Sequence, residues 1–334
     1  MDGLSVIDVG ALLLDKPDTT AASHEFQQVA EAIDRACRDT GFFLISGHGV
    51  SSAALDRLET AARAFFGLPE AEKAQIAMAR GGRAWRGWFP EDGELTAGRP
   101  DHKEGLYFGE DLPGEDPRVL AGLALHGPNQ FPVGVADLRP AVEVWMSEMT
   151  RLGHALARGV SLGLGLDAGW LDRHLTADPT VLFRIFRYPP RPTDDDGWGV
   201  AEHTDYGLLT ILAHDGTPGL EVRGPGGWLE VPSVPDTFVV NLGDMLDRMT
   251  GGRYRSTPHR VRHATAREGA QDRLSFPFFF DPAWDAEILP VPLGDDAPAD
   301  DAGTRWDATS VHQWSGTYGE YLTAKVANVF PALG

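Results

Sequence analysis

Residues 200–212 constrain the fold and chemistry of this 334-residue chain more than any other segment. The second half of this segment, residues 208–212, is apolar and rich in residues that favour β-structure, which predicts a strand. His203 and Asp205 lie two residues apart just before it, and alternate side chains of an extended strand point to the same face. The spacing therefore predicts an imidazole and a carboxylate side by side.

A third metal ligand is available in the run Ser-Thr-Pro-His-Arg-Val, where His259 follows a proline. Two histidines and one carboxylate form the facial set that binds non-haem Fe(II) and leaves coordination positions open for other ligands. A His-x-Asp pair alone occurs by chance in surface turns. Its combination with a later histidine, and with the strand described next, is far more specific and predicts an iron site.

Arg273 and Ser275 are also two residues apart, at the start of an apolar strand that continues through residues 276–280. An immobilised guanidinium next to a hydroxyl can bind a carboxylate through charge-assisted hydrogen bonds. This second pair therefore predicts an anion-binding position on a strand that follows the metal ligands.

Composition excludes several classes of function. The 29 basic and 49 acidic residues give a formal net charge of −20, which argues against binding to nucleic acid or an anionic membrane. The first residues lack the basic and apolar regions of a signal peptide, and no apolar run approaches transmembrane length. The single cysteine, Cys37, is expected to be a buried helical residue, and we expect a cytoplasmic protein.

The periodicity of apolar residues changes from helical to strand-like along the chain. Helical spacing predicts helices over residues 23–40, 137–166 and 318–330, with two more following residues 51 and 69. Short strands separated by Gly/Pro turns are predicted at residues 42–46, 181–188, 208–212, 219–222, 228–231, 237–242 and 260–263. This pattern predicts a mainly β protein with packed helices, built on a two-sheet jelly-roll core behind a helical N-terminal region.

We expect one compact unit with four regions, because the sequence shows neither a repeat nor a clean linker. The regions are an N-terminal part with a substrate-side loop (1–135), a long scaffold helix (136–175), the jelly roll with the metal site (176–285), and a C-terminal loop and helix (286–334). Polar loops are expected at residues 193–197 and 294–303.

Residues 80–135 are rich in Gly, Pro and charge, yet they contain two tryptophans close together. Arg86, Trp88 and Phe89 either plug one end of the core or overhang a pocket and contact the substrate. The basic residues of this segment favour an acidic or amino-acid-like substrate, or else serve solubility.

Two further candidate substrate contacts lie in the second half of the chain. Arg184 shares a strand face with Tyr188, so it either binds a substrate carboxylate or pairs with a buried acid. Tyr206 follows Asp205 directly and is the other candidate.

With these residues identified, the chain resembles the Fe(II)/2-oxoglutarate-dependent oxygenases, in the isopenicillin-N-synthase-like branch. Residues 6–9 and 41–50 are similar to the N-terminal region of that branch. Its core motifs are matched in order by Arg-Tyr-Pro-Pro (187–190), Glu-His-Thr-Asp (202–205), Val-Asn-Leu-Gly-Asp (240–244), Thr-Pro-His-Arg-Val (257–261) and Arg-Leu-Ser (273–275).

The resemblance implies a double-stranded β-helix fold and three cofactors or cosubstrates, namely Fe(II), 2-oxoglutarate and O2. It implies that the iron ligands are His203, Asp205 and His259. It also implies that 2-oxoglutarate is bound by Arg273, Ser275 and Tyr188. The implied reaction oxidises a C–H bond of a small molecule, amino-acid-like or a secondary metabolite, by hydroxylation, desaturation or cyclisation, and releases succinate and CO2.

Two departures from the family pattern keep other functions open. Plant members usually carry Asn-Tyr-Tyr before the prolines, whereas this chain has Phe186, Arg187 and Tyr188. The asparagine that often assists 2-oxoglutarate binding is therefore absent, and Tyr188 would be the only residue of this run to contact the cosubstrate. Isopenicillin N synthase also has an Arg-x-Ser pair but uses no 2-oxoglutarate. The alternatives are therefore an Fe(II) oxidase of that type and a non-catalytic jelly-roll ligand sensor.

Overall fold

The computed structural model describes residues 3–14, 20–96, 98–191, 198–224, 226–263, 271–293, 300–306, 308–312 and 315–329. The polar loop expected at residues 193–197 lies outside the described residues, as do residues 294–299 of the acidic loop. The helices are α1 (Thr20–Asp39), α2 (Ser52–Phe66), α3 (Glu70–Lys73), α4 (Pro117–Leu120), α5 (Leu138–Gly163), α6 (Asp244–Met249) and α7 (Tyr318–Val329). The strands are β1 (Val6–Asp8), β2 (Phe42–Ser46), β3 (Gly87–Phe89), β4 (Leu95–Thr96), β5 (Arg99–Pro100), β6 (Glu104–Gly109), β7 (Thr180–Tyr188), β8 (Val200–His203), β9 (Leu209–His214), β10 (Leu220–Gly224), β11 (Gly227–Glu230), β12 (Phe238–Leu242), β13 (His259–Val261) and β14 (Arg273–Asp281).

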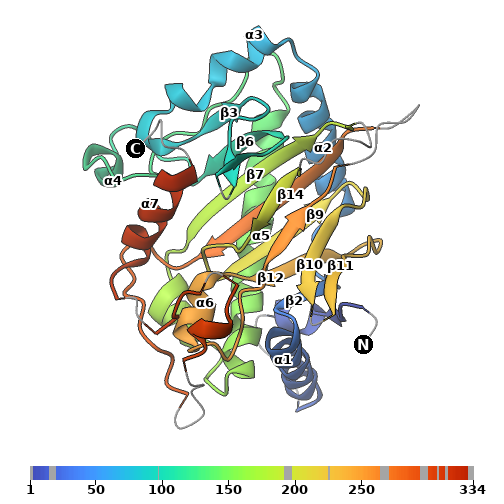
Figure 1. Ribbon diagram of the computed structural model, residues 1–334, viewed down its shortest axis with the longest axis vertical. Helices are drawn as coiled ribbons and strands as arrows, with labels where there is room; N and C mark the ends of the chain where they lie inside the picture. The colour runs from blue at the N-terminus through green and yellow to red at the C-terminus, as the bar shows by residue number, and fades with distance from the viewer. Residues whose placement is uncertain are drawn as a thin grey trace.

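Two sheets form the core of the molecule. The larger has eight strands in the order β1-β2-β12-β9-β14-β7-β6-β3, and the smaller has four in the order β11-β10-β13-β8. In Figure 1 the strands of the large sheet cross the centre of the molecule, and β10 and β11 of the small sheet lie at one side of the molecule. From β7 to β14 the chain passes repeatedly between the two sheets, since β8, the hairpin β10–β11 and β13 belong to the small one and β7, β9, β12 and β14 to the large one. The predicted jelly roll with helices packed outside is confirmed.

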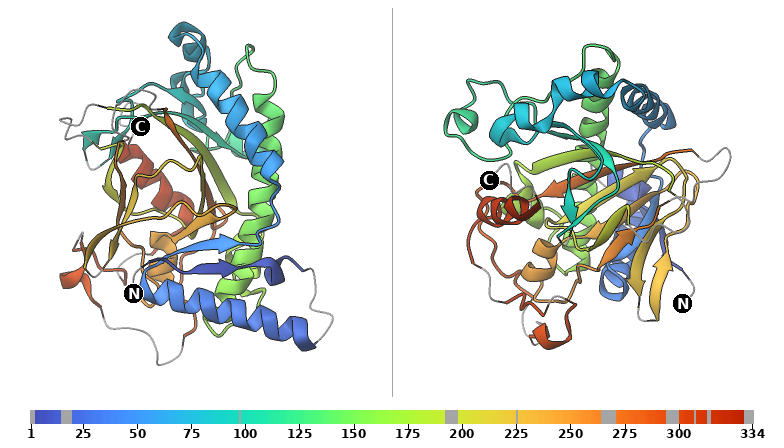
Figure 2. Two further views of the ribbon diagram at one scale, coloured as in Figure 1. Left: turned by 90° about the vertical axis from the view of Figure 1, so that its right-hand side faces the viewer. Right: turned by 45° about the horizontal axis from the view of Figure 1, so that its top comes forward.

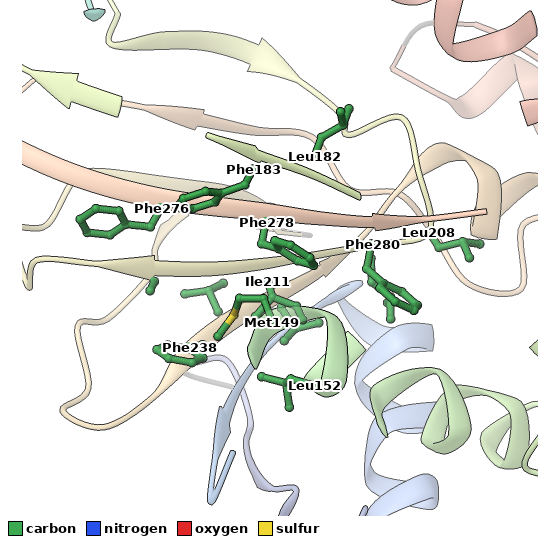
Figure 3. Close-up of a cluster of buried hydrophobic side chains, with 14 of the residues drawn as sticks. Met149, Leu152, Leu182, Phe183, Leu208, Ile211, Phe238, Phe276, Phe278 and Phe280 are labelled. Carbon is green, nitrogen blue, oxygen red and sulfur yellow. The ribbon is translucent and has the colours of Figure 1, made fainter. Parts of the chain in front are cut away.

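Helices cover the outer face of the large sheet. Figure 2 shows α5 and α2 running along this face, with α7 on the opposite side of the sheet. In Figure 3 Phe278 and Phe280 of β14 extend from the sheet toward Met149 and Leu152 of α5, and all four side chains are buried. Leu182 of β7 points away from that layer, toward the space between the sheets. The apolar face of α5 thus closes one side of the core, and the other side of the sheet is left for the site.

Strand register positions the candidate site residues. β8 and β13 are antiparallel, and His203 lies directly opposite His259. β14 pairs with β7 so that Arg273 lies opposite Tyr188 and Ser275 opposite Phe186. Hydrogen-bonded strand pairs therefore bring together residues from separate sequence motifs, namely the two histidines in the small sheet and Arg273 with Tyr188 in the large one.

Two local predictions were wrong. His203 is the last residue of β8 and Asp205 lies beyond it, where the chain crosses from the small sheet to β9 of the large one, so the two do not share a regular strand. The segment 80–135, for which the sequence predicted no strand, contains β6, which pairs with both β3 and β7. All six residues of β6 are buried, so its two faces carry no polar–apolar alternation that a sequence pattern could report.

No helix in the described part of the chain is both long and apolar enough to cross a lipid bilayer.

The contact between α5 and β14 requires a glycine. A Cβ atom on Gly153 would lie 2.4 Å from Cδ2 of Phe280. We therefore expect Gly153→Val to lower the free energy of unfolding by about 1–3 kcal/mol through overpacking, measured by urea denaturation. Ser147→Ala, at an exposed position of the same helix, is the control and should change it by less than about 0.5 kcal/mol. Equal stability of the Gly153 variant and the parent would contradict this packing.

Candidate metal centre

Two histidines and one aspartate converge between the sheets. Candidate ligand atoms of His203, Asp205 and His259 all lie within 4.8 Å of one another. The Nε2 atoms of the two histidines are 4.0 Å and 3.9 Å from Oδ1 of Asp205. The separations of 4.0 Å and 3.9 Å are compatible with ligands of one ion, because atoms bound to a metal at about 2.0–2.2 Å cannot be more than roughly 4.4 Å apart.

Backbone carbonyls fix the orientation of both imidazole rings. Nδ1 of His203 is 2.8 Å from the carbonyl oxygen of Ala201, and Nδ1 of His259 is 3.2 Å from that of Thr257. A carbonyl can only accept, so each Nδ1 carries the proton and each Nε2 keeps a free lone pair. The two Nε2 atoms are therefore the metal-binding atoms of the pair.

The carboxylate of Asp205 is oriented in the same way. Its Oδ2 accepts hydrogen bonds from the Thr210 hydroxyl at 2.6 Å and from Nδ2 of Asn241 at 2.7 Å. The backbone N–H of Asp244 also donates to the Asp205 carbonyl at 2.7 Å. Because Oδ2 is engaged on strands of the large sheet, Oδ1 is the oxygen presented to the two Nε2 atoms.

Burial and the charges of neighbouring groups favour the protonation states in which all three side chains can bind a metal. Burial lowers the pKa of His203, and burial together with the nearby His203 lowers the pKa of His259 to about 4. Burial alone would raise the pKa of Asp205, but His259 and His203, with the two hydrogen bonds to its carboxylate, lower it overall. At neutral pH the site thus offers two neutral imidazoles and one carboxylate.

The three residues lie in the wall of a cavity of about 340 Å³. Its lining comes from both sheets, from the segment around β4 and from α7. The candidate residues that line it, besides the three ligands, are Tyr188, Arg273, Ser275, Arg184 and Tyr206. The structure therefore gathers most of the residues singled out in the sequence around one space.

Arg273 is buried in this wall and has no carboxylate partner among the residues that the structure describes. It is 2% exposed and forms no ion pair within the described ranges of the chain. Its Nε donates to the carbonyl of Thr217 at 3.2 Å, whereas its Nη1 has no hydrogen-bond partner among those same residues. The ring of Tyr188 lies 5.0 Å from the guanidinium carbon. A buried, uncompensated cation is costly, so these donors fit the carboxylate of a bound ligand.

Three of the predicted substrate contacts do not reach the cavity. Arg86 donates to the carbonyls of Ala84 and Leu125, at 2.9 Å and 2.7 Å. Nε1 of Trp88 donates to Glu104 at 2.8 Å, and Phe89 packs edge-on against Tyr107 with 5.3 Å between ring centroids. None of the three lines the cavity. Their aromatic and basic character serves the packing of β3 and β6, which corrects the expected substrate contact.

The sequence analysis assigned no individual role to several residues that line the cavity. Thr210 and Asn241 could have been found, because each is a polar residue inside an apolar strand. Glu94 and Lys103 line the cavity from a Gly/Pro-rich segment, and Asp281 lines it from the end of β14. These three reach the site through long-range contacts that no local pattern indicates.

Asp281 connects the metal-site loop with α7. Its Oδ1 accepts from the backbone N–H of Leu208 at 3.1 Å, and its Oδ2 accepts from the Tyr318 hydroxyl at 2.5 Å. Burial raises the pKa of Asp281 to about 7 despite these hydrogen bonds. A second tie joins the hydroxyl of Tyr321 to Asp244 at 2.8 Å. Helix α7 is thereby held against the cavity next to the metal ligands.

Loss of the amide that holds Asp205 should weaken metal binding. Asn241→Ala removes one of two donors to Oδ2, so the carboxylate is less firmly oriented, and we expect the affinity for Fe(II) or Zn(II) to fall about 10–100-fold. Anaerobic titration calorimetry measures the change. Asn129→Ala, which removes an amide bonded to Gly109 far from the triad, is the matched control. An unchanged affinity in the Asn241 variant would show that this hydrogen bond has no positioning role.

Comparisons with known proteins place this site in a family. Residues 4–134 match the family model described as the N-terminal region of non-haem dioxygenases in morphine synthesis. Residues 179–282, which contain the triad and Arg273, match the model of the 2OG-Fe(II) oxygenase superfamily. The two matches together cover most of the chain.

Similar proteins extend over the full length. A probable iron/ascorbate oxidoreductase of Dictyostelium discoideum is 39% identical over 100% of this chain and 96% of its own. Homoarginine-6-hydroxylase of Arabidopsis thaliana is 33% identical over 98% of this chain and 97% of its own. A Neurospora crassa protein, solved in complex with alpha-KG and thymine, shares the fold with a TM-score of 0.77 at 22% identity, covering 97% of this chain and 96% of its own. The chain belongs to the 2OG-Fe(II) oxygenase superfamily.

Proposed function

We propose that His203, Asp205 and His259 bind Fe(II), and that this centre oxidises a C–H bond of a small molecule with 2-oxoglutarate as cosubstrate. The observation that carries the proposal is a single cavity containing both the triad and the uncompensated Arg273. A metal site alone would fit many functions. The buried guanidinium of Arg273 in the same cavity supplies a positive charge and hydrogen-bond donors for one carboxylate of a dicarboxylate cosubstrate.

The residues of the chain have separable roles in this reaction. Arg273 binds the distal carboxylate of 2-oxoglutarate, and the hydroxyls of Ser275 and Tyr188 add hydrogen bonds from the paired strands β14 and β7. Thr210 and Asn241 keep Asp205 in its ligating orientation. When bound, Fe(II), 2-oxoglutarate and O2 supply the oxidant, and succinate and CO2 are the products. The enclosing sheets and α7 shield that chemistry from bulk water.

A small substrate is supported by the size of the cavity and by the relatives. Their names include homoarginine-6-hydroxylase, 1-aminocyclopropane-1-carboxylate oxidase and clavatol oxidase. We propose that Arg184 and Tyr206, which line the cavity, contact such a substrate, amino-acid-like or a secondary metabolite. A cytoplasmic location is part of the proposal, because Fe(II) and a lone cysteine suit a reducing compartment.

Spectroscopy separates this proposal from its alternatives. Anaerobic addition of Fe(II) and then 2-oxoglutarate to the apo-protein should give a weak metal-to-ligand charge-transfer band in the visible range. Iron binding without that band, and turnover without succinate, would instead indicate an Fe(II) oxidase of the isopenicillin-N-synthase type. Protein that binds no iron at all would indicate a ligand sensor.

Removal of a single ligand should abolish turnover. In His203→Ala or Asp205→Ala the metal keeps only two protein ligands, so neither the charge-transfer band nor succinate should form. His126→Ala removes an imidazole that packs against Trp284, away from the cavity, and should leave both intact. Full succinate formation in either ligand variant would refute the assigned centre.

Arg273 should act on cosubstrate affinity and not on iron. Arg273→Ala deletes a buried charged contact, and we expect 2-oxoglutarate binding to weaken by about 2–5 kcal/mol while Fe(II) binding stays within about twofold. The dependence of the charge-transfer band on 2-oxoglutarate concentration reports the affinity. Arg139→Ala, an exposed arginine on α5, is the control. Unchanged 2-oxoglutarate affinity would remove Arg273 from the assigned role.

A further inference from the structure

A second guanidinium lines the cavity at a distance from the first. Arg184 and Tyr188 lie on the same face of β7, four residues apart, which places them about 13 Å from each other along the strand. Tyr188 is paired with Arg273 across the sheet. Arg184 therefore lies too far along β7 to bind the same carboxylate as Arg273.

Two aromatic rings hold Arg184 in place. Its guanidinium carbon is 4.2 Å from the ring centroid of Tyr107 and 4.8 Å from that of Phe279. Phe279 lines the cavity as well. Contacts of this kind immobilise the guanidinium while leaving its edge free to donate hydrogen bonds. Arg184 is thus a rigid donor that needs little ordering when a ligand binds.

The nearest acid leaves Arg184 only partly compensated. Oε1 of Glu94 is 3.6 Å from Nη1 of Arg184, and the same oxygen accepts from the Tyr107 hydroxyl at 2.5 Å. The other oxygen of Glu94 lies 2.8 Å from Nζ of Lys103. The Nε of Arg184 is buried and has no hydrogen-bond partner in the described part of the chain. Glu94 is therefore shared among three groups, and the Arg184 side chain, which is 18% exposed, still presents its guanidinium to the cavity.

The surroundings favour an anion on an apolar body. The apolar part of the cavity wall includes Leu182, Phe186, Leu212, Phe279 and Leu322. Lys325 of α7 also lines the cavity, and its Nζ lies 5.4 Å from the Tyr206 ring centroid.

The acids near Arg184 are already engaged, which disfavours an amine as the bound group. Glu94 is shared as described, and both oxygens of Asp281 accept hydrogen bonds, from Leu208 and Tyr318.

We propose that the substrate is a small organic acid with an apolar body, and that Arg184 binds its carboxylate. This assignment rests on the proposed function of the site. It gives the two arginines different ligands: Arg273 the cosubstrate and Arg184 the substrate. The carboxylate anchors the substrate, and the apolar walls direct its C–H bonds toward the metal ligands in the facing sheet.

Matched acids and amides test the proposal in the parent protein. The anaerobic Fe(II)–2-oxoglutarate complex is titrated by calorimetry with phenylacetate and phenylacetamide, hexanoate and hexanamide, and L-leucine and L-leucinamide. At least one acid should bind tenfold or more tightly than its amide, without bleaching the charge-transfer band. Equal binding of every pair, no binding by any acid, or acids that bind only by displacing 2-oxoglutarate would each overturn the proposal.

Variants then locate the contact. In Arg184→Met the responding acid should bind at least 30-fold more weakly and its amide about as before, while 2-oxoglutarate still gives its band. Arg184→Lys should recover part of the loss, because it restores the charge but not the planar fork. Arg139→Met is the matched surface control. Unaltered acid binding in Arg184→Met would assign the preference elsewhere and overturn the role of Arg184.

The outcomes also distinguish this inference from the function beneath it. Absence of both the charge-transfer band and succinate in the parent protein would show that the proposed function itself fails. A normal band with succinate formation, but no preference for acids over amides, would reject only the substrate class.

Discussion

The carboxylate of Asp205 connects the two sheets on which the site depends. Its Oδ2 is held by Thr210 of β9 and Asn241 of β12, both in the large sheet. Its Oδ1 faces His203 and His259, which come from paired strands of the small sheet. The sheets must therefore keep a fixed separation for three ligands to meet at one ion. Helix α5 packs against the large sheet on the face away from the cavity and supports the strands that carry Thr210 and Arg273.

Charge inside the cavity is unevenly compensated. Lys103 has close carboxylate partners in Glu94 and Asp101, at 2.8 Å and 2.5 Å. Arg273 has none among the described residues, and Arg184 has only a shared one at 3.6 Å. Leaving buried cations unpaired lowers stability in the empty protein, and a ligand carboxylate recovers that free energy on binding. We therefore expect bound anions at the two arginines that lack a close carboxylate partner among the described residues.

Much of this arrangement could be predicted from sequence, because the period of apolar residues and the order and spacing of the motifs can be read along the chain. The jelly roll and the grouping of His203, Asp205 and His259 were inferred in this way, and the structure brings the three residues together. Of the two interpretations of Arg86, the substrate contact was the wrong one, because its partner carbonyl at Leu125 lies 39 residues away and no local pattern indicates it. Asp281 was missed for the same reason, since its importance comes from Leu208 and from α7. The positions and roles of such residues depend on contacts between segments that are far apart in the sequence.

Helix α7 lies outside the jelly roll, yet Tyr318, Leu322 and Lys325 form part of the cavity wall. The metal ligands and their supporting residues lie on other elements of the chain. Substitutions at Leu322 or Lys325 can therefore change the shape and charge of the cavity without touching a ligand to the metal. Selection can act on the two sets separately. A lineage of gene duplicates could keep one oxidising centre unchanged while this single helix diverges to admit new substrates.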